Sequence, residues 1–178
     1  PAIIYGLRGL AYFEIRVFGP DRDLHSGSFG GVIHNPAQAL CELIAGMHDS
    51  NGRITLPGFY DTVLPLSSQE REELARLNMD DAYYCAQTGS PAPRGEAGFT
   101  ASERIGARPT LEVNGFLSGF TGQGAKTIIP AKAMAKISTR LVPNQDPKKV
   151  HEQLVAYMEQ NAPKSIRWEV ELLSTGSP

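Results

Sequence analysis

A histidine in a glycine-rich segment is the first residue that could carry chemistry. His25 stands in the sequence DLHSGSFGG, residues 23–31, between a predicted strand and a predicted helix. Loops on rigid scaffolds often hold binding groups, and an imidazole ring offers a hydrogen-bond donor near physiological pH. His25 could therefore donate a hydrogen bond to a developing oxyanion. The residue pattern equally allows a surface histidine without a role.

Arg140 and Thr127 are two further candidates, and both lie close to one predicted strand. Arg140 is near the end of that strand on its polar face, where a guanidinium fork could bind a carboxylate. Thr127 comes just before Ile128-Ile129-Pro130, and its hydroxyl could bind a ligand in the loop that leads into the strand. The alternatives are a solvated arginine and a threonine that bonds to its local backbone.

Other residues that often hold metals or cofactors lack the spacing that such sites need. His34, His48 and His151 have no Cys, Asp or Glu at a zinc-binding spacing. The glycines within residues 119–124 precede a strand and not a helix, so they do not form a dinucleotide-binding fingerprint. The sequence contains neither a nucleophile elbow nor a Cys–His arrangement. The chain by itself is therefore expected to hold no metal and no complete active site.

Composition limits the partners and the location. The chain has 178 residues, enough for one domain with a hydrophobic core, and a net charge of −2 from interspersed acids and bases. No basic stripe favours nucleic acid, and no apolar run approaches the roughly 20 residues that a membrane span requires. Two cysteines without a disulfide or zinc spacing favour a reducing cytoplasm. The missing initiator Met favours an excised segment of a longer protein over a processed N-terminus.

The elements that must position these residues follow from hydrophobic periodicity. Residues 11–18 alternate between apolar and polar side chains, as a half-buried strand does. Asn35 and Pro36 then provide an N-cap and a first-turn proline for a helix that ends in the turn residues 49–52. Residues 52–108 are irregular and resemble an insertion, with one short helix expected within residues 67–77.

The second half of the chain shows the same kinds of pattern. Residues 110–114 form a predicted second strand, a flexible glycine-rich connection covers 115–124, and residues 131–142 alternate as a third strand. Asp146 and Pro147 repeat the cap-and-proline pair at the start of a second helix. The apolar stripe of this helix and the apolar face of the last strand consist of Val150, Leu154, Tyr157, Met158, Ile166, Trp168, Val170 and Leu172.

The predicted order of elements is strand, helix, insertion, strand, strand, helix, strand. This order is typical of an α+β protein with a ferredoxin-like (split βαβ) plait, in which two helices cover one face of a four-stranded antiparallel sheet. The plait core is expected to span about residues 9–51 and 109–174, and the insertion about residues 52–108. The fold alone implies no function, because it hosts enzymes, regulatory modules and assembly domains.

Five strings in register over nearly the whole chain resemble the M20 metallopeptidase family, and most of all its carnosinase-like cytosolic dipeptidases. They are YGLRG at residues 5–9, DLHSGSFGG at 23–31, LPGFYD at 56–61, KTIIPA at 126–131 and RLVPN at 140–144. In that family a plait domain interrupts a catalytic domain with two zinc ions and mediates homodimerisation. The resemblance therefore implies that residues 1–178 are a single lid and dimerisation domain without its catalytic domain.

The resemblance also implies roles for the three candidate residues. The position of His25 matches the family histidine that reaches into the partner subunit's active site and polarises the scissile carbonyl. Thr127 and Arg140 match residues that bind the C-terminal part of a small peptide substrate, with Arg140 on the carboxylate. The two zinc ions and their ligands would belong to the parent's own catalytic domain, so this chain alone is expected to be inactive.

Two alternatives remain open from the sequence. A stand-alone regulatory or assembly module of ferredoxin-like fold would leave the histidine loop and the segment from Thr127 to Arg140 without a common purpose. The lid of a related M20 aminoacylase or carbamoyl hydrolase would share those features, although the insertion with its LPGFYD string favours a dipeptidase.

Overall fold

The computed structural model describes residues 6–178. Tyr5, the first residue of the YGLRG string, lies outside the described residues. Pro1 lies outside them as well, so the structure does not test the prediction about the start of the chain.

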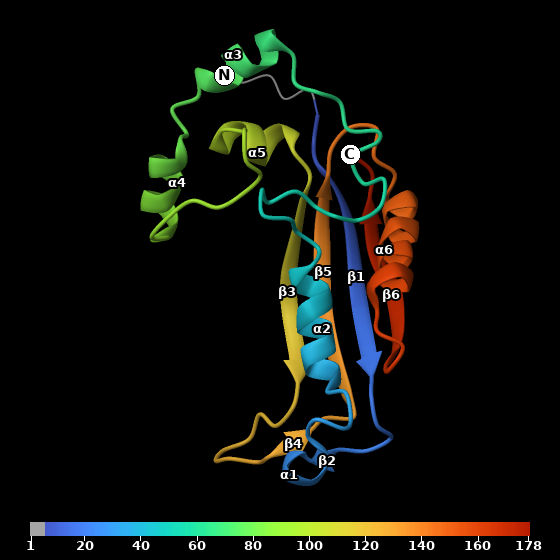
Figure 1. Ribbon diagram of the computed structural model, residues 1–178. Coiled ribbons are helices and arrows are strands. Elements are labelled where there is room, and N and C mark those ends of the chain that lie inside the picture. Colours follow the sequence, from blue (N-terminus) through green and yellow to red (C-terminus); the bar gives the residue numbers. More distant parts are fainter. Residues whose placement is uncertain (1–5) are drawn as a thin grey trace.

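A four-stranded sheet forms the frame of the molecule (Figure 1). Its strands are β1 (Gly9–Phe18), β3 (Thr110–Ser118), β5 (Lys132–Leu141) and β6 (Arg167–Gly176). They lie in the order β3-β5-β1-β6, and every neighbouring pair is antiparallel. This order is that of the split βαβ plait, so the predicted fold class is confirmed.

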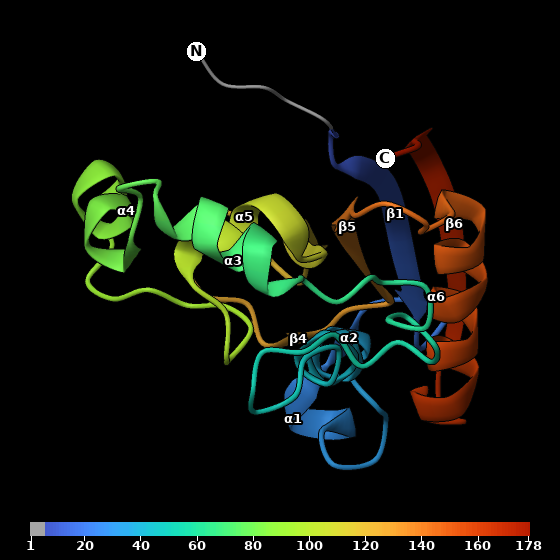
Figure 2. The ribbon, with the colours of Figure 1, turned by 90° about the horizontal axis from the view of Figure 1, so that it is seen from above.

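Two helices cover one face of this sheet, as the sequence predicts (Figures 1 and 2). Helix α2 (Pro36–Ala45) packs on β5 and β1, and α6 (Pro147–Asn161) packs on β1 and β6. Both begin with the expected pair of a cap and a proline, because the side chains of Asn35 and Asp146 accept the backbone N–H groups of Ala37 and Lys148. Each helix therefore begins at its proline, directly after the polar residue that caps it.

The core lies between the sheet and these two helices. The inward residues of β1 are fully buried, and so are most of the inward residues of β5. The largest buried side chains include Phe13, Ile15, Leu40, Leu154 and Phe59, the last of which comes from the stretch after α2. Gln145 donates from Nε2 to the carbonyl oxygen of Phe59 at 3.0 Å. Burial of these apolar side chains is the main force that holds the helices on the sheet.

Strand β3, at one edge of the sheet, keeps apolar side chains in contact with solvent. Val113 and Phe116 on its inner face are 45% and 44% exposed, because α2 sits over β5 and β1 and does not reach the edge. The prediction that this strand ends at Asn114 is wrong. The strand continues through a bulge between Val113 and Gly115 and ends at Ser118, since the extra residue lets the pairing with β5 resume.

Residues 52–108 contain three helices, where the sequence predicts one. They are α3 (Ser68–Ala75), which matches the prediction, and α4 (Asp81–Thr88) and α5 (Ala101–Ala107), which the sequence reading missed. Both missed helices are short and have little apolar periodicity, so their caps hold the only signal. Thr100 and Glu103 form a capping box at the start of α5. These helices gather around the end of the sheet where β1 begins and β5 ends (Figure 1).

A buried ion pair ties this segment together. Arg108 donates from Nε and Nη2 to the two carboxylate oxygens of Glu96 at 2.8 and 2.7 Å, and Arg53 donates to the same carboxylate at 3.2 Å. The guanidinium of Arg108 also stacks over the ring of Phe99 at 4.3 Å. The buried charges of Glu96 and Arg108 thus have partners of opposite sign, and these contacts connect distant parts of residues 52–108.

Candidate functional site

His25 belongs to β2, which lies at the tip of the molecule opposite the start of β1 and the C-terminus (Figure 1). It closes the two-residue strand β2 (Leu24–His25) and caps the one-turn helix α1 (Ser26–Phe29), two elements that the sequence did not predict. The backbone N–H of Gly27 donates to Nδ1 of His25 at 3.0 Å. Because Nδ1 accepts, the neutral ring carries its proton on Nε2.

Thr127 meets His25 at this tip. Its Oγ1 is 3.1 Å from His25 Nε2, and its carbonyl oxygen accepts the backbone N–H of Ser26 at 3.0 Å. Strand β2 pairs with β4 (Ile128–Ile129), which directly follows Thr127. His25 therefore donates to the threonine oxygen, and the threonine hydroxyl is left with its own proton to donate to a ligand.

Asp23 is a member of this arrangement that the sequence reading did not single out. Its Oδ1 accepts the backbone N–H of Ala131 at 2.9 Å, and the Ala131 carbonyl accepts the N–H of Gly19 at 2.9 Å. These bonds hold the histidine loop against the segment that carries Thr127. Asp side chains often accept backbone N–H groups in loops, and this was the only signal in the sequence. It does not show that the partner of Asp23 is Ala131, which is distant in sequence.

His25 and Thr127 are both exposed to solvent, and exposed apolar side chains occur close to them in the sequence. Large side chains with exposed surface near the tip in the chain are Phe29, Val32, Ile33 and Phe120, and Val32 is 79% exposed. The Lys126 ammonium lies 5.8 Å from the centre of the Phe120 ring. Two exposed hydrogen-bonding side chains that lie next to each other suit recognition of a polar group of a ligand.

Arg140 lies at the other end of the sheet, so the structure does not bring it together with His25 and Thr127. It is exposed near the end of the ten-residue strand β5, whereas Thr127 precedes the start of that strand. At about 3.3 Å per residue, this separation is roughly 30 Å. Gly9 pairs with Leu141, and Leu10 with Gly176, so both ends of the described chain lie near Arg140.

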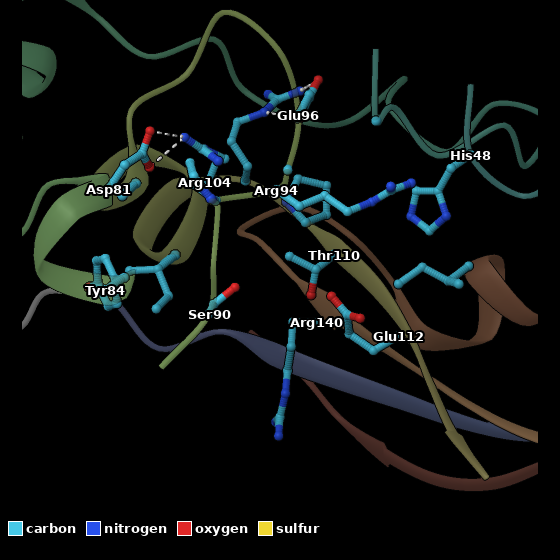
Figure 3. Close-up of a pocket in the computed structure, with 18 of the residues that line it drawn as sticks. His48, Asp81, Tyr84, Ser90, Arg94, Glu96, Arg104, Thr110, Glu112 and Arg140 are labelled. Carbon is cyan, nitrogen blue, oxygen red and sulfur yellow. Dashed lines mark hydrogen bonds and ion pairs between the residues drawn. The ribbon is translucent and has the colours of Figure 1, made fainter. Parts of the chain in front are cut away.

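A hollow of about 660 Å³ opens at the Arg140 end (Figure 3). One wall comes from the plait and includes Thr110, Glu112 and Arg140, and the other comes from residues 52–108 and includes Ser90 and Arg94. Figure 3 shows the Arg140 side chain extending away from the carboxylate of Glu112. The insertion thus forms part of the environment of the predicted carboxylate-binding residue.

His48 also lines this hollow, and its ring lies beside the guanidinium of Arg94 (Figure 3). Burial lowers the pKa of His48, and the positive charge of Arg94 lowers it further, whereas Glu112 and Asp49 act in the opposite direction. The ring therefore favours its neutral form in the folded chain.

Across residues 6–178, no group of three or more His, Cys, Asp or Glu side chains is placed to hold a metal ion. In the same part of the chain, no helix has the length and apolar character needed to cross a bilayer.

Residues 5–166 match the family described as the peptidase dimerisation domain. Among curated proteins, the chain is 34% identical over 182 residues to a Cys-Gly metallodipeptidase of Candida albicans, covering 99% of this chain and 37% of that protein. It is also 34% identical over 159 residues to the Beta-Ala-His dipeptidase of Homo sapiens, covering 89% of this chain and 31% of that protein. The chain thus spans about a third of the length of these relatives.

Among solved structures, the crystal structure of human carnosine dipeptidase 1 is similar, with a TM-score of 0.85 and 32% sequence identity. The match covers 99% of this chain and 38% of that one.

Proposed function

The chain belongs to the M20 peptidase dimerisation domain family, and we propose that it is the lid and dimerisation domain of a zinc-dependent dipeptidase. The relatives named above are a metallodipeptidase and a dipeptidase that are about three times as long as the matched region. A catalytic part with two zinc ions would lie outside this chain, because the chain spans only about a third of the length of these relatives. A cytoplasmic location and the inactivity of the isolated chain stay predictions.

One observation carries the proposal further: the candidate residues occupy opposite ends of one rigid sheet. In the longer protein we expect the catalytic part to join the chain beside Gly9 and Gly176, at the end where Arg140 lies. His25 and Thr127 would then be roughly 30 Å from their own catalytic part, given the rise of a strand. We therefore expect His25 and Thr127 to serve a second subunit, while Arg140 serves its own.

The edge strand β3 supplies a surface for that second subunit. Val113, Phe116 and Leu117 are exposed there, and β3 has unpaired backbone groups along its outer side. The opposite edge, β6, directs the charged residues Arg167, Glu169 and Glu171 away from the core and exposes one large apolar side chain, Leu173. If β3 paired with β3 of a second copy about a two-fold axis, the β3 edge of each copy would be covered and its apolar side chains would be buried.

The local geometry supports distinct tasks for the two tip residues. The proton on His25 Nε2 points to Thr127 in the free chain and is available to a substrate carbonyl oxygen, because both side chains are exposed. A neutral donor aimed at that oxygen stabilises the charge that develops there during peptide hydrolysis. The Thr127 hydroxyl would bind the C-terminal part of the peptide, and Arg140 of the other subunit would bind its carboxylate.

The first test is hydrolysis of dipeptides by the full-length protein with and without His25. We expect His25→Ala to lower kcat by about a hundredfold, the usual effect of losing one oxyanion donor, with unchanged zinc content. His34→Ala is the matched control, because His34 bonds to Ser165 and not to Thr127. Unchanged turnover in His25→Ala, or zinc bound in stoichiometric amount by the 178-residue chain alone, would contradict the proposal.

A further inference from the structure

Arg8 and Arg140 are two of the three arginines that line the hollow without an ion pair among the described residues, the third being Arg94, and the charges of Arg8 and Arg140 act on each other. Arg140 pairs with Leu10 across β5 and β1, and Arg8 precedes Leu10 by two residues. Side chains two residues apart in extended chain point to the same side, so Arg8 lies diagonally across from Arg140. Both residues line the hollow.

Most arginines of residues 52–108 differ from Arg8 and Arg140 in having acidic partners. In residues 52–108, all arginines except Arg94 have a carboxylate within ion-pair distance, namely Arg53, Arg71, Arg76, Arg104 and Arg108. Within residues 6–178, by contrast, neither Arg8 nor Arg140 forms an ion pair. Glu112 is an acidic residue that lines the same hollow, but the Arg140 side chain extends away from it (Figure 3).

The electrostatic environment of Arg8 is correspondingly unfavourable. Burial lowers the pKa of this half-buried guanidinium, and the neighbouring charge of Arg140 lowers it further, although the group stays protonated. Two like charges on neighbouring segments of the chain repel each other unless an anion lies between them. A carboxylate can accept from two guanidinium groups at once, because its two oxygens offer about four acceptor sites.

We propose that Arg8 is a second substrate-binding residue, which together with Arg140 holds the C-terminal carboxylate of the peptide. This inference rests on the proposed dipeptidase function and extends it by one residue. The pair recognises a terminal carboxylate in particular, because a neutral C-terminal amide cannot compensate two positive charges. Arg8 thus adds to the selection of short peptides with a free C-terminus.

The test compares a dipeptide with its C-terminal amide, using the full-length enzyme and the variants Arg8→Ala and Arg8→Lys. We expect Arg8→Ala to raise KM for the dipeptide by about tenfold or more, as loss of a charge-assisted hydrogen bond does, with little change in kcat. The inhibition constant of the amide as a competitor should not change. Arg8→Lys, which keeps the charge, should recover part of the loss.

Arg76→Ala is the control, because Arg76 is exposed and pairs only with Glu73 in α3. Equal weakening of the dipeptide and its amide would mean that Arg8 supports the protein and not the carboxylate, and an unchanged KM would remove Arg8 from the site. Either result overturns this inference and leaves the proposed function standing if the wild type hydrolyses dipeptides. No hydrolysis by the wild type would overturn both.

Discussion

Thr127 Oγ1 lies 3.1 Å from Nε2 of His25, although 102 positions separate the two residues in the chain. The contact is held by the short β2–β4 pairing and by the bond from Ser26 N–H to the Thr127 carbonyl. The second ring nitrogen of His25, Nδ1, accepts the backbone N–H of Gly27. The pair is therefore arranged in the folded chain before any substrate or second subunit is present.

Asp23 should be needed for this arrangement through its bond to Ala131 N–H. Asp23→Ala leaves that N–H without its partner, and we expect a loss of about 1 kcal/mol in the free energy of unfolding. Asp23→Asn keeps an acceptor oxygen and should stay close to the wild type. Urea unfolding of the 178-residue chain measures both.

Asp21→Ala serves as the control for this measurement. Asp21 is exposed and its ion pair with Arg167 is long, at 3.9 Å, so its loss should have almost no effect. Equal stability of Asp23→Ala and Asp21→Ala would show that the bond to Ala131 does not hold the loop.

The edge of β3 should mediate self-association. Phe116→Glu places a charge where the two copies would meet, and we expect it to shift the chain from dimer to monomer in sedimentation velocity. Leu173→Glu on β6 is a matched control, because Leu173 is 43% exposed and Phe116 is 44% exposed. A monomeric wild type, or dissociation by Leu173→Glu alone, would place the dimer contact elsewhere. Thermal unfolding of each variant separates dissociation from loss of fold.

His48 should make the stability of the chain depend on pH. Its pKa is lower in the folded chain than in the unfolded one, chiefly because of burial, so the unfolded chain binds more protons in this range. Stability should therefore rise with pH through the range just below the ordinary histidine pKa and level off above it. His48→Gln should flatten this part of the curve in urea unfolding between about pH 5 and 7.5. An unchanged slope would assign the dependence to other groups.

The sequence allowed the frame of the fold to be predicted, because its elements have one apolar side and explicit caps. The alternation through Phe13 and Ile15 and the pairs Asn35-Pro36 and Asp146-Pro147 are local signals with a clear physical meaning. The bulge that extends β3 past Gly115 depends on the partner strand, so residues 110–118 alone do not reveal it. Helices α4 and α5 are short, with weak apolar patterns.

The candidate site could be predicted only in part for a similar reason. His25, Thr127 and Arg140 were recognised by their residue types together with family resemblance, and their roles stay predictions. The separation of Thr127 from Arg140 follows from their places before and near the end of one strand, but the position of His25 beside Thr127 was not visible, because it depends on the pairing of β2 with β4. Asp23 and Arg8 were missed, because the proposed role of each depends on a neighbour that is distant in sequence, Ala131 for Asp23 and Arg140 for Arg8.

His25 is proposed to act on the other subunit while Arg140 acts on its own, and mixing two inactive variants of the full-length enzyme tests this division most directly. A mixed dimer of His25→Ala and Arg140→Ala subunits would contain one intact site, so exchange of subunits should restore about a quarter of wild-type activity. Mixing His25→Ala with Thr127→Ala should restore none, because both residues lie on the same tip. Activity that stays at the level of the separate variants in the first mixture would contradict the assignment of His25 and Arg140 to different subunits of one site.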